Sequence, residues 1–263
     1  MNYVLGFNIG NTNTTMGIYE KDSIAPAKTY TYKTDKKITS DELGIQIKNF
    51  VNINSENNAT KNKIIGITFS SVVTEVNKSY KSMSGDFFGL QPLEIGCDIK
   101  LGITLKYDNP KELGSDRIAN AEAAYREYKT DCIIIDLGTA NTFCVLHANG
   151  IFDGGLIGPG IGITIEALAD KTSKLSRVSF EKPDKMIATS TIEAIKSGFF
   201  YGYIVMINGI IKEIENIYKK EFLTILTGGF SNIVSNYMDK KHIFDPILTL
   251  KGIKYLYDLN KNQ

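Results

Sequence analysis

Two short segments of the chain carry the same arrangement of glycine, asparagine and threonine residues. Residues 7–14 read FNIGNTNT and residues 135–142 read IDLGTANT. Each pattern predicts a strand, a tight glycine turn and a return strand. Glycine lets the backbone approach an anionic ligand closely, and neighbouring hydroxyl and N–H groups can donate hydrogen bonds to phosphate oxygens. The pair predicts a phosphate clamp, although two ordinary hairpins would also favour Asn and Gly in their turns.

The two segments differ at one position that matters for metal chemistry. Their alignment places Asn8 opposite Asp136. A carboxylate at the end of the first strand would hold Mg²⁺ or a metal-bound water, because hard divalent ions take oxygen ligands and keep several waters. Asn8 keeps one side-chain oxygen but lacks the charge. The repeat therefore shows where a carboxylate is expected and an amide is found.

The composition is that of a globular protein and excludes several classes of function. The chain has 263 residues, of which 43% are hydrophobic and 22% charged, and its net charge is +1. This charge gives no general attraction to nucleic acid or to an anionic membrane. Cys97, Cys132 and Cys144 are widely spaced, which favours reduced thiols over disulfides or metal ligands. No basic leader is recognised and no transmembrane-length window is expected, so a cytoplasmic protein is predicted.

The periodicity of apolar residues along the chain predicts two tandem units with a similar order of strands and helices. The first contains strands at 3–9, 14–19 and 29–34, a helix at 41–51 capped by Ser40, a polar loop at 52–62, a strand at 64–70 and a helix at 73–83. The second contains a helix at 115–128, strands at 133–136, 142–146 and 151–157, helices at 161–169 and 191–217, a strand at 223–226 and a helix at 249–259. Such a duplication predicts an α/β architecture of two lobes with a ligand cleft between them.

An ordered series of motifs, running nearly end to end, resembles the type III pantothenate kinases of the acetate and sugar kinase, Hsp70 and actin superfamily. The matching segments are IGNT at 9–12, YDNP at 107–110, GSDR at 114–117, DLGTA at 136–140, GG at 154–155 with PG at 159–160, TGG at 227–229 and DPILTLKG at 245–252. The resemblance implies duplicated actin-like (ribonuclease H-like) lobes, each a mixed sheet with flanking helices. The lobes would be residues 1–113 and 114–263, with the last helix free to pack back on the first lobe.

The resemblance also implies an activity and a catalytic base. The reaction would transfer the γ-phosphoryl group of ATP to the primary hydroxyl of pantothenate, the first step of coenzyme A synthesis. Phosphoryl transfer depends on positioning, on charge stabilisation and on one group that accepts the attacking hydroxyl's proton. Asp116 has that role by resemblance; helix capping is the alternative for an aspartate at the start of a helix.

Arg117 has support from composition as well as from resemblance. Arginine occurs only at positions 117, 126 and 177, and its forked guanidinium suits a carboxylate such as that of pantothenate. A surface salt bridge is the alternative for Arg117, and it is the expectation for Arg126 and Arg177. The resemblance places Tyr107 in the substrate pocket, although a tyrosine before a turn also serves in packing. It adds Gly114, Ser115 and Thr191 to the substrate-binding residues.

The same resemblance assigns the nucleotide, the metal ions and the partners. The nucleotide or phosphate residues would be Asn8, Gly10, Asn11, Thr12, Gly138, Thr139, Gly228 and Gly229. Asp136 would contact a monovalent cation (K⁺ or NH₄⁺) or Mg²⁺, with Asn8 as a weak metal ligand. A homodimer that binds pantothenate and ATP, and neither nucleic acid nor membrane, is expected. His147 and His242 show no pattern of metal or triad chemistry.

Departures from the family pattern keep other readings open. Besides Asn8, the segment 187–191 lacks a glycine expected near its start. One hypothesis is an active homodimeric kinase that tolerates Asn8. Another is a catalytically weakened relative that acts as a partner subunit or regulator, in a heteromer with an intact companion. A third is a different sugar or acid kinase of the superfamily, which the match at 107–117 argues against.

Overall fold

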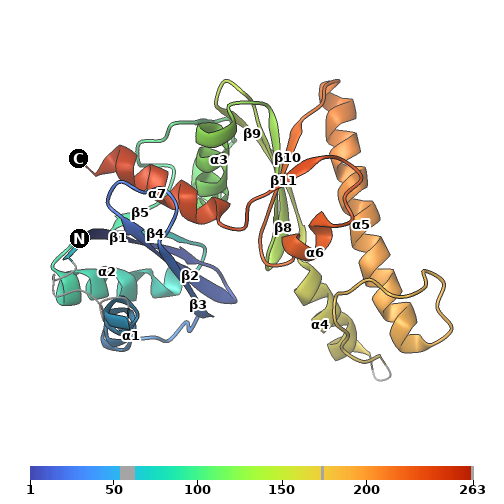
Figure 1. Ribbon diagram of the computed structural model, residues 1–263, viewed down its shortest axis with the longest axis horizontal. Coiled ribbons are helices and arrows are strands. Elements are labelled where there is room, and N and C mark those ends of the chain that lie inside the picture. Colours follow the sequence, from blue (N-terminus) through green and yellow to red (C-terminus); the bar gives the residue numbers. More distant parts are fainter. Residues whose placement is uncertain (54–62, 173–174, 262–263) are drawn as a thin grey trace. The chain divides into compact units, whose positions relative to one another are not determined.

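The chain forms two compact units in the computed structural model, which describes residues 1–53, 63–172 and 175–261 (Figure 1). Unit 1 comprises Met1–Glu127 and Ile247–Gln263, and unit 2 comprises Tyr128–Pro246. Unit 1 therefore contains, beyond the predicted lobe 1–113, residues 114–127 and the segment of the last helix, which was expected to be free to pack there. Most of the predicted 52–62 loop, residues 54–62, lies outside the described residues.

Unit 1 is built on a mixed sheet whose strand order is β3-β2-β1-β4-β5. The pairs β1–β2 and β2–β3 are antiparallel, whereas β1–β4 and β4–β5 are parallel. Its elements are β1 (Asn2–Ile9), β2 (Asn13–Glu20), β3 (Lys28–Lys33), α1 (Ser40–Ile53), β4 (Lys63–Ser71), α2 (Thr74–Phe88), β5 (Leu93–Glu94), β6 (Thr104–Leu105), the 3₁₀ helix η1 (Pro110–Glu112), α3 (Ser115–Tyr128) and α7 (Leu248–Asn260).

The two faces of this sheet are covered by different helices. Alternate residues of β1, among them Leu5 and Phe7, pack with α1 and α2 in one hydrophobic cluster. The opposite face carries glycines, and α7 packs there. A Cβ on Gly6 would lie 3.0 Å from the Ile253 side chain, and one on Gly66 would lie 1.9 Å from the Tyr257 hydroxyl. Small residues on one face of the sheet therefore admit the last helix, which Figure 1 shows on the side opposite α1 and α2.

Unit 2 repeats the strand order and strand directions of unit 1. Its strands β11-β10-β7-β8-β9 lie in that order, with β7–β8 and β8–β9 antiparallel and β10 parallel to both β7 and β11. Its elements are β7 (Cys132–Leu137), β8 (Ala140–Leu146), β9 (Ile151–Pro159), α4 (Ile161–Lys171), α5 (Thr191–Tyr218), β10 (Leu223–Thr227), α6 (Ser231–Ser235) and β11 (His242–Phe244). An antiparallel meander followed by a parallel strand thus occurs twice, and the predicted duplicated α/β architecture is confirmed.

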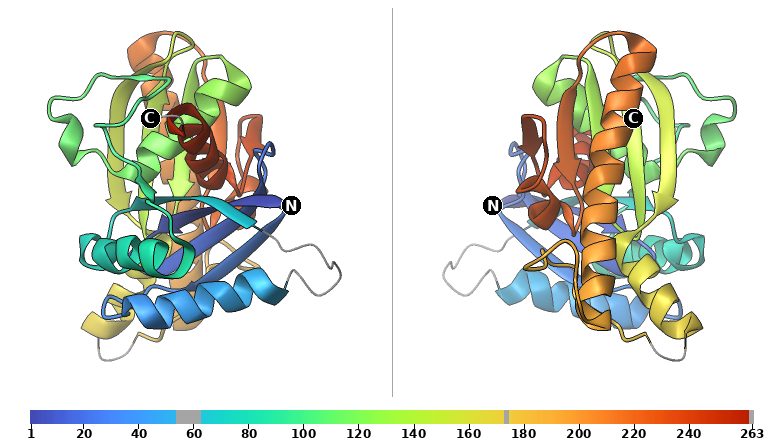
Figure 2. Two further views of the ribbon diagram at one scale, coloured as in Figure 1. Left: turned by 90° about the vertical axis from the view of Figure 1, so that its left-hand side faces the viewer. Right: turned by 90° about the vertical axis from the view of Figure 1, so that its right-hand side faces the viewer.

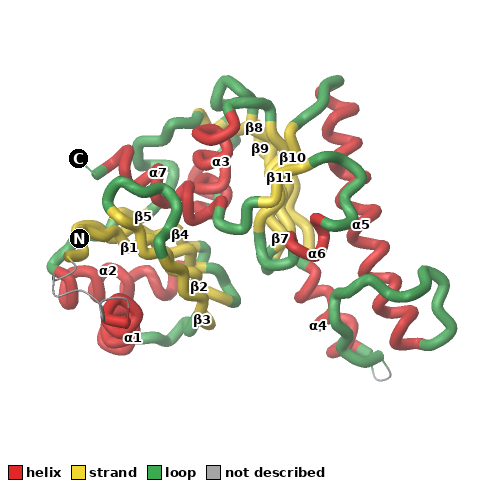
Figure 3. Tube along the Cα trace, in the orientation of Figure 1, coloured by secondary structure: helices red, strands yellow, loops and turns green. Residues whose placement is uncertain are grey.

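Helix α5 is the longest helix that the structure describes, and Figures 2 and 3 show it running along the sheet of unit 2. By length and composition it could cross a membrane, so the expectation that no window reaches that length was wrong. One face of α5 is nevertheless buried, and Phe200, Ile207 and Ile211 pack in the hydrophobic cluster of unit 2. The apolar residues of α5 therefore contribute to the hydrophobic core of unit 2.

The predicted elements are found, but their caps and several short elements are not those expected. The N-cap of α1 is Thr39 and not Ser40: the Thr39 hydroxyl accepts the Glu42 N–H at 3.3 Å, and the Glu42 carboxylate accepts the Thr39 N–H at 3.0 Å. This reciprocal pair satisfies two orphan donors. The short elements β5, β6, η1, α6 and β11 were not predicted, because two to five residues are too few to show a periodicity.

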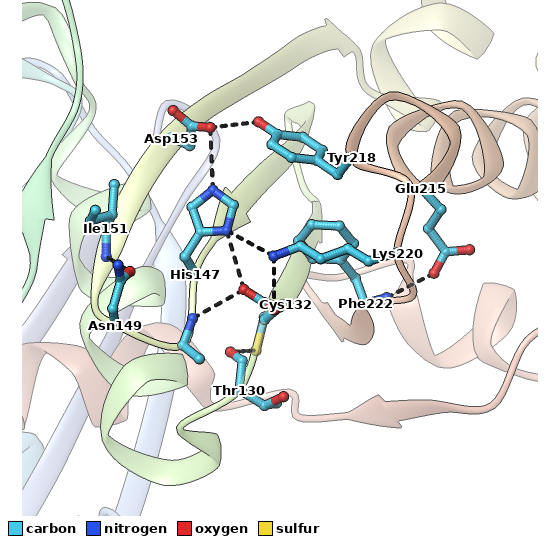
Figure 4. A network of polar contacts seen from close by, with 12 residues as sticks. Thr130, Cys132, His147, Asn149, Ile151, Asp153, Glu215, Tyr218, Lys220 and Phe222 are labelled. Carbon is cyan, nitrogen blue, oxygen red and sulfur yellow. Dashed lines mark hydrogen bonds and ion pairs between the residues drawn. The ribbon is translucent and has the colours of Figure 1, made fainter.

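A polar network links the β8–β9 hairpin to the end of α5 (Figure 4). The His147 ring lies between two carboxylates, with Nδ1 3.2 Å from Asp131 and Nε2 3.2 Å from Asp153. The Tyr218 hydroxyl donates to Asp153 at 2.7 Å, and Lys220 pairs with Asp131 at 2.8 Å. Burial and the nearby Asp153 raise the pKa of Tyr218 to about 12. His147, for which the sequence suggested no chemistry, is here a structural residue.

Candidate active site

The first glycine turn joins β1 to β2 and is braced from β3. The Gly10 N–H donates to the Asn13 carbonyl at 3.1 Å. The Thr34 hydroxyl donates to the Gly10 carbonyl at 2.7 Å and pairs with the buried Thr14 hydroxyl at 2.9 Å. Asn11 and Thr12, at the outside of the turn, are exposed. Thr34 was missed by sequence reasoning; its place at the end of a predicted strand was the only available signal.

Asn8 lies at the carboxyl end of β1, beside the segment that begins α3. Its register partners are Thr15 on β2 and Ser70 on β4. The Ser70 hydroxyl pairs with the Ser115 hydroxyl at 2.9 Å. The Ser115 hydroxyl also accepts the Ser71 N–H at 2.9 Å. The strand ends and the start of α3 are therefore tied together, and the polar Ser70-Ser71 pair ending a buried strand was the missed sequence signal.

Asp116 occupies the first turn of α3, half-buried, directly after the tie at Ser115. Its Oδ1 accepts the Arg117 backbone N–H at 2.7 Å. A Cβ on Gly114 would lie 2.6 Å from that Oδ1, so glycine leaves room for the carboxylate. Burial raises the pKa of Asp116, and the N–H and charge of Arg117 oppose this effect only in part. A carboxylate with a raised pKa is a stronger proton acceptor than an ordinary aspartate.

Arg117 and Tyr107 meet beside this carboxylate segment. The Arg117 Nη1 lies 3.5 Å from the Tyr107 hydroxyl, and the guanidinium carbon lies 5.8 Å from the centre of the tyrosine ring. Arg117 is only 4% exposed, which excludes a surface ion pair. By contrast, Arg177 pairs with Asp170 at 3.8 Å with both side chains exposed, as expected of a surface salt bridge.

The second glycine turn, between β7 and β8 in unit 2, lies against a third glycine turn after β10. The Gly138 N–H donates to the Ala140 carbonyl at 3.2 Å. Asp136 pairs in register with Thr227, at the end of β10. A Cβ on Gly228 would lie 2.5 Å from the Asp136 Oδ1, and Gly228 has a φ of +92°, which favours glycine. The carboxylate therefore sits in a cradle that only glycine leaves open, and Gly229 next to it is exposed.

The two glycine turns are not equivalent in strand register. Ile9 pairs with Thr14 in unit 1, whereas Leu137 pairs with Asn141 in unit 2, one position earlier in the repeat. Asn141 is fully buried like Thr14, and its amide donates to the Pro159 carbonyl at 3.1 Å. The sequence alignment matched Thr14 with Thr142, so it was off by one position after the turn.

Gly160 supports the second turn from the start of α4. A Cβ at this position would lie 2.1 Å from the Thr139 carbonyl oxygen and 2.5 Å from that of Gly138. The predicted loop glycine is therefore required by close approach of two backbones. Thr191, by contrast, is exposed at the first turn of α5, next to the N-cap Ser190. The contacts described for unit 2 do not join Thr191 to the glycine turns.

The described residues offer few ligands for a metal ion. No group of three His, Cys, Asp or Glu residues in the described part of the chain could hold a metal ion. Mg²⁺ is commonly held by one or two carboxylates together with substrate phosphates and water. The cradled Asp136 fits that mode of binding, whereas the Asn8 amide offers an oxygen without charge.

Comparison with known proteins identifies the family. The model of the type III pantothenate kinase family matches residues 4–213. A type III pantothenate kinase of Listeria monocytogenes serotype 4a is 42% identical over 258 residues, which are 98% of each chain. The chain belongs to the type III pantothenate kinase family. The enzyme of that name from Listeria innocua is 40% identical over the same share of both chains.

Solved structures support the fold assignment alone. A putative Baf family transcriptional activator from Campylobacter jejuni has a TM-score of 0.62 at 22% identity, covering 98% of this chain and 100% of that chain. A ROK family glucokinase from Streptomyces griseus has a TM-score of 0.52 at 14% identity, covering 99% and 100%. The type III pantothenate kinase chain thus shares its fold with a sugar kinase, and the family implies the use of ATP and a divalent metal ion.

Proposed function

We propose that the protein phosphorylates pantothenate with ATP to give 4′-phosphopantothenate, the first step of coenzyme A biosynthesis. The observation that carries this proposal is the 42% identity to a type III pantothenate kinase over 98% of both chains. The site of unit 1 supplies the matching chemistry, since it holds a carboxylate and a buried guanidinium next to each other on α3. The same features favour a kinase that acts on pantothenate over another sugar or acid kinase.

In unit 1, different residues act on the hydroxyl and on the carboxylate of the substrate. Asp116 accepts the proton of the attacking hydroxyl, a role supported by its raised pKa. Arg117 and Tyr107 bind the pantothenate carboxylate, a role supported by the buried guanidinium beside the tyrosine hydroxyl. Gly114 leaves space for the carboxylate of Asp116, and Ser115 positions the segment through Ser70.

Each glycine turn supplies backbone donors to phosphate. In unit 1, Gly10 lets the backbone approach the phosphate, and Asn11 and Thr12 supply the donors; in unit 2, Gly138 allows the approach and Thr139 donates, with Gly228 and Gly229 on the nucleotide side. Asp136 holds the divalent ion or a monovalent cation such as K⁺ or NH₄⁺, because its carboxylate lies in the glycine cradle. When bound, the divalent ion neutralises phosphate charge. Thr191 contributes to the substrate pocket by family resemblance alone.

A homodimer in the cytoplasm is the proposed form of the enzyme. Large apolar side chains are exposed on β9, α4 and α5, namely Leu156 (45%), Ile157 (64%), Ile163 (47%), Ile192 (52%), Val205 (66%) and Ile217 (73%). Contiguous exposed apolar surface marks interaction sites, and Leu156 and Ile217 line one pocket between β9 and α5. A Val205→Glu variant should shift the mass measured by light scattering to that of the monomer. Ile45→Glu, equally apolar and 59% exposed but on α1, is the control. An unchanged mass for the first variant would contradict this interface.

Asn8 is the feature that favours the second candidate, a weakened relative acting as a partner subunit or regulator. The test is phosphorylation of pantothenate by the purified chain with Mg²⁺ and K⁺, beside an Asn8→Asp variant. We expect the wild type to be active and the variant to need less Mg²⁺, because a carboxylate holds the ion better than an amide. An inactive wild type with an active variant would favour the weakened-relative reading, and the absence of activity in both would contradict the proposed kinase activity of the isolated chain.

A further inference from the structure

The segment between β5 and α3 carries Tyr107 and is attached to its surroundings at specific points. Residues 96–113 contain only the short elements β6 and η1. Asn260, at the end of α7, brackets Lys100 with two hydrogen bonds: its Oδ1 accepts the Lys100 N–H at 3.0 Å, and its amide donates to the Lys100 carbonyl at 2.9 Å. A segment with so little regular structure depends on such attachments for its position.

Glu122 provides the next attachment, from within α3. Its side chain is 0% exposed, and its Oε2 accepts the Gly102 N–H at 2.8 Å. Its Oε1 accepts the Arg126 Nε–H at 2.8 Å, one helical turn further along. A buried carboxylate is costly unless it is paired and hydrogen-bonded. Both oxygens of Glu122 meet that condition.

Gly102 fits tightly against this ion pair. A Cβ on Gly102 would lie 2.4 Å from the Glu122 Oε1 and 2.8 Å from the Arg126 Nη2. The backbone of the segment therefore rests directly on the two charged side chains. Arg126, expected from the sequence to make a surface salt bridge, in fact pairs with a fully buried partner.

The same helix touches the segment again at Tyr107. The Tyr107 hydroxyl lies 3.5 Å from the Arg117 Nη1. Helix α3 thus holds the segment at two places, through Glu122 to Gly102 and through Arg117 to Tyr107. We propose that Glu122 is a positioning residue for pantothenate binding: by holding Gly102, it sets where Tyr107 lies over Arg117. The proposal rests on the substrate-binding roles proposed above for Tyr107 and Arg117.

The test compares three variants of the full-length protein by steady-state kinetics. Glu122→Ala removes the acceptor of the Gly102 N–H, and we expect KM for pantothenate to rise roughly tenfold or more, because small misplacements near a site are costly. KM for ATP should stay the same. Glu122→Gln keeps an acceptor for Gly102 but loses the charge next to Arg126, so it should recover most of the affinity for pantothenate.

Glu127→Gln is the matched control. Glu127 lies on the same helix and pairs with Lys251 at 2.9 Å, on the side of α7. This variant should change thermal stability without changing KM for either substrate. All assays are made well below the unfolding temperature of the least stable variant, so that loss of folded protein does not enter KM.

Hydrogen exchange provides a readout that does not depend on turnover. Glu122→Ala should speed exchange of backbone amides in residues 100–108, whereas Glu127→Gln should leave them unchanged. Unaltered exchange in that segment, or an unchanged KM for pantothenate in an active Glu122→Ala enzyme, would overturn the positioning role. An inactive wild type would instead contradict the proposed function, while exchange would still decide whether Glu122 positions the segment. If Glu122→Ala does not fold, hydrogen exchange in Glu122→Gln decides: the lost charge next to Arg126 should speed exchange in residues 100–108, and unaltered exchange there would overturn the positioning role.

Discussion

Replacing Asp116 by asparagine should remove activity and increase stability at the same time. In the wild type the Asp116 carboxylate accepts the Arg117 N–H at 2.7 Å. The amide keeps an oxygen that can accept this hydrogen bond, but it can neither take up a proton nor carry a charge. Loss of a general base costs roughly 10²- to 10⁴-fold in rate. The same substitution removes a charge that burial disfavours, since burial raises the pKa of Asp116. Activity should fall and stability should rise, and both changes come from the loss of one ionisable group.

The size of the stability gain follows from the pKa elevation. Each unit by which the folded-state pKa exceeds the unfolded one makes the ionised group destabilising by about 1.4 kcal/mol. A gain of 1 kcal/mol corresponds to a rise in Tm of roughly 2–4 °C for a chain of about this length. Because Asp116 as a residue is only half-buried and Arg117 offsets part of the burial effect, we expect an increase in Tm of a few degrees at most.

The difference in stability between the wild type and Asp116→Asn should depend on pH. Below the unfolded-state pKa, Asp116 is protonated in both states and contributes no difference. As the pH rises toward the elevated folded-state pKa, the unfolded state ionises first and the wild type loses stability relative to the variant. The advantage of Asp116→Asn in Tm should therefore be largest above the raised folded-state pKa and should shrink as the pH falls toward the ordinary pKa of an aspartate. The kcat/KM of the wild type should fall over the same acidic range.

Asp131→Asn is the matched control. Burial disfavours the ionised Asp131, but hydrogen bonds from Lys220, the Ala148 N–H and His147 outweigh it, so its pKa is lowered. The control should lose stability at pH 7 and keep its activity. Differential scanning calorimetry and initial rates decide the outcome. Full activity in Asp116→Asn would remove this residue as the base, and a lower Tm in that variant would refute the argument from burial.

Two further substitutions test the packing of each unit. Gly252→Ala should lower the free energy of unfolding by roughly 1–3 kcal/mol, because the added Cβ would lie 1.8 Å from the Ala119 carbonyl oxygen and overpacking forces α7 away from α3. Chemical denaturation measures this change, and a more stable variant would show that the helices separate without cost. Tyr218→Phe removes the hydrogen bond to Asp153, which accepts at 2.7 Å, and should cost roughly 1.5–3 kcal/mol as a bond to a charged group. Thermal unfolding checks it, and a Tm equal to that of the wild type would mean that the network of Figure 4 does not need the hydroxyl.

Local patterns were enough to predict most of the fold. Apolar runs and turn residues predicted the strands that became β1, β4 and β7, because a buried strand needs a continuous apolar face and a terminating turn. The helix predicted at 115–128 has the observed bounds of α3. The short strands and α6 were missed because elements of two to five residues are too short to show a periodicity, and tertiary contacts decide whether they form.

The site shows the same division between local and distant information. Glycine and carboxylate residues at turns were visible in the sequence, and so Asp116, Arg117 and Asp136 could be named. The residues that hold them were not visible: Ser70 reaches Ser115 across 45 positions, and Glu122 reaches Gly102 across 20. No periodicity links residues at such separations.

The sequence by itself determined the family, the duplicated strand-and-turn units and the chemical groups available for phosphoryl transfer, because these depend on residue types and near neighbours. Only the tertiary structure decided the register of the two turns, where Ile9 pairs with Thr14 but Leu137 pairs with Asn141. It also decided which carboxylate is buried and which is neutralised by neighbours. Burial and hydrogen bonding are properties of the packed chain, and they set the pKa of Asp116 and the room around Asp136.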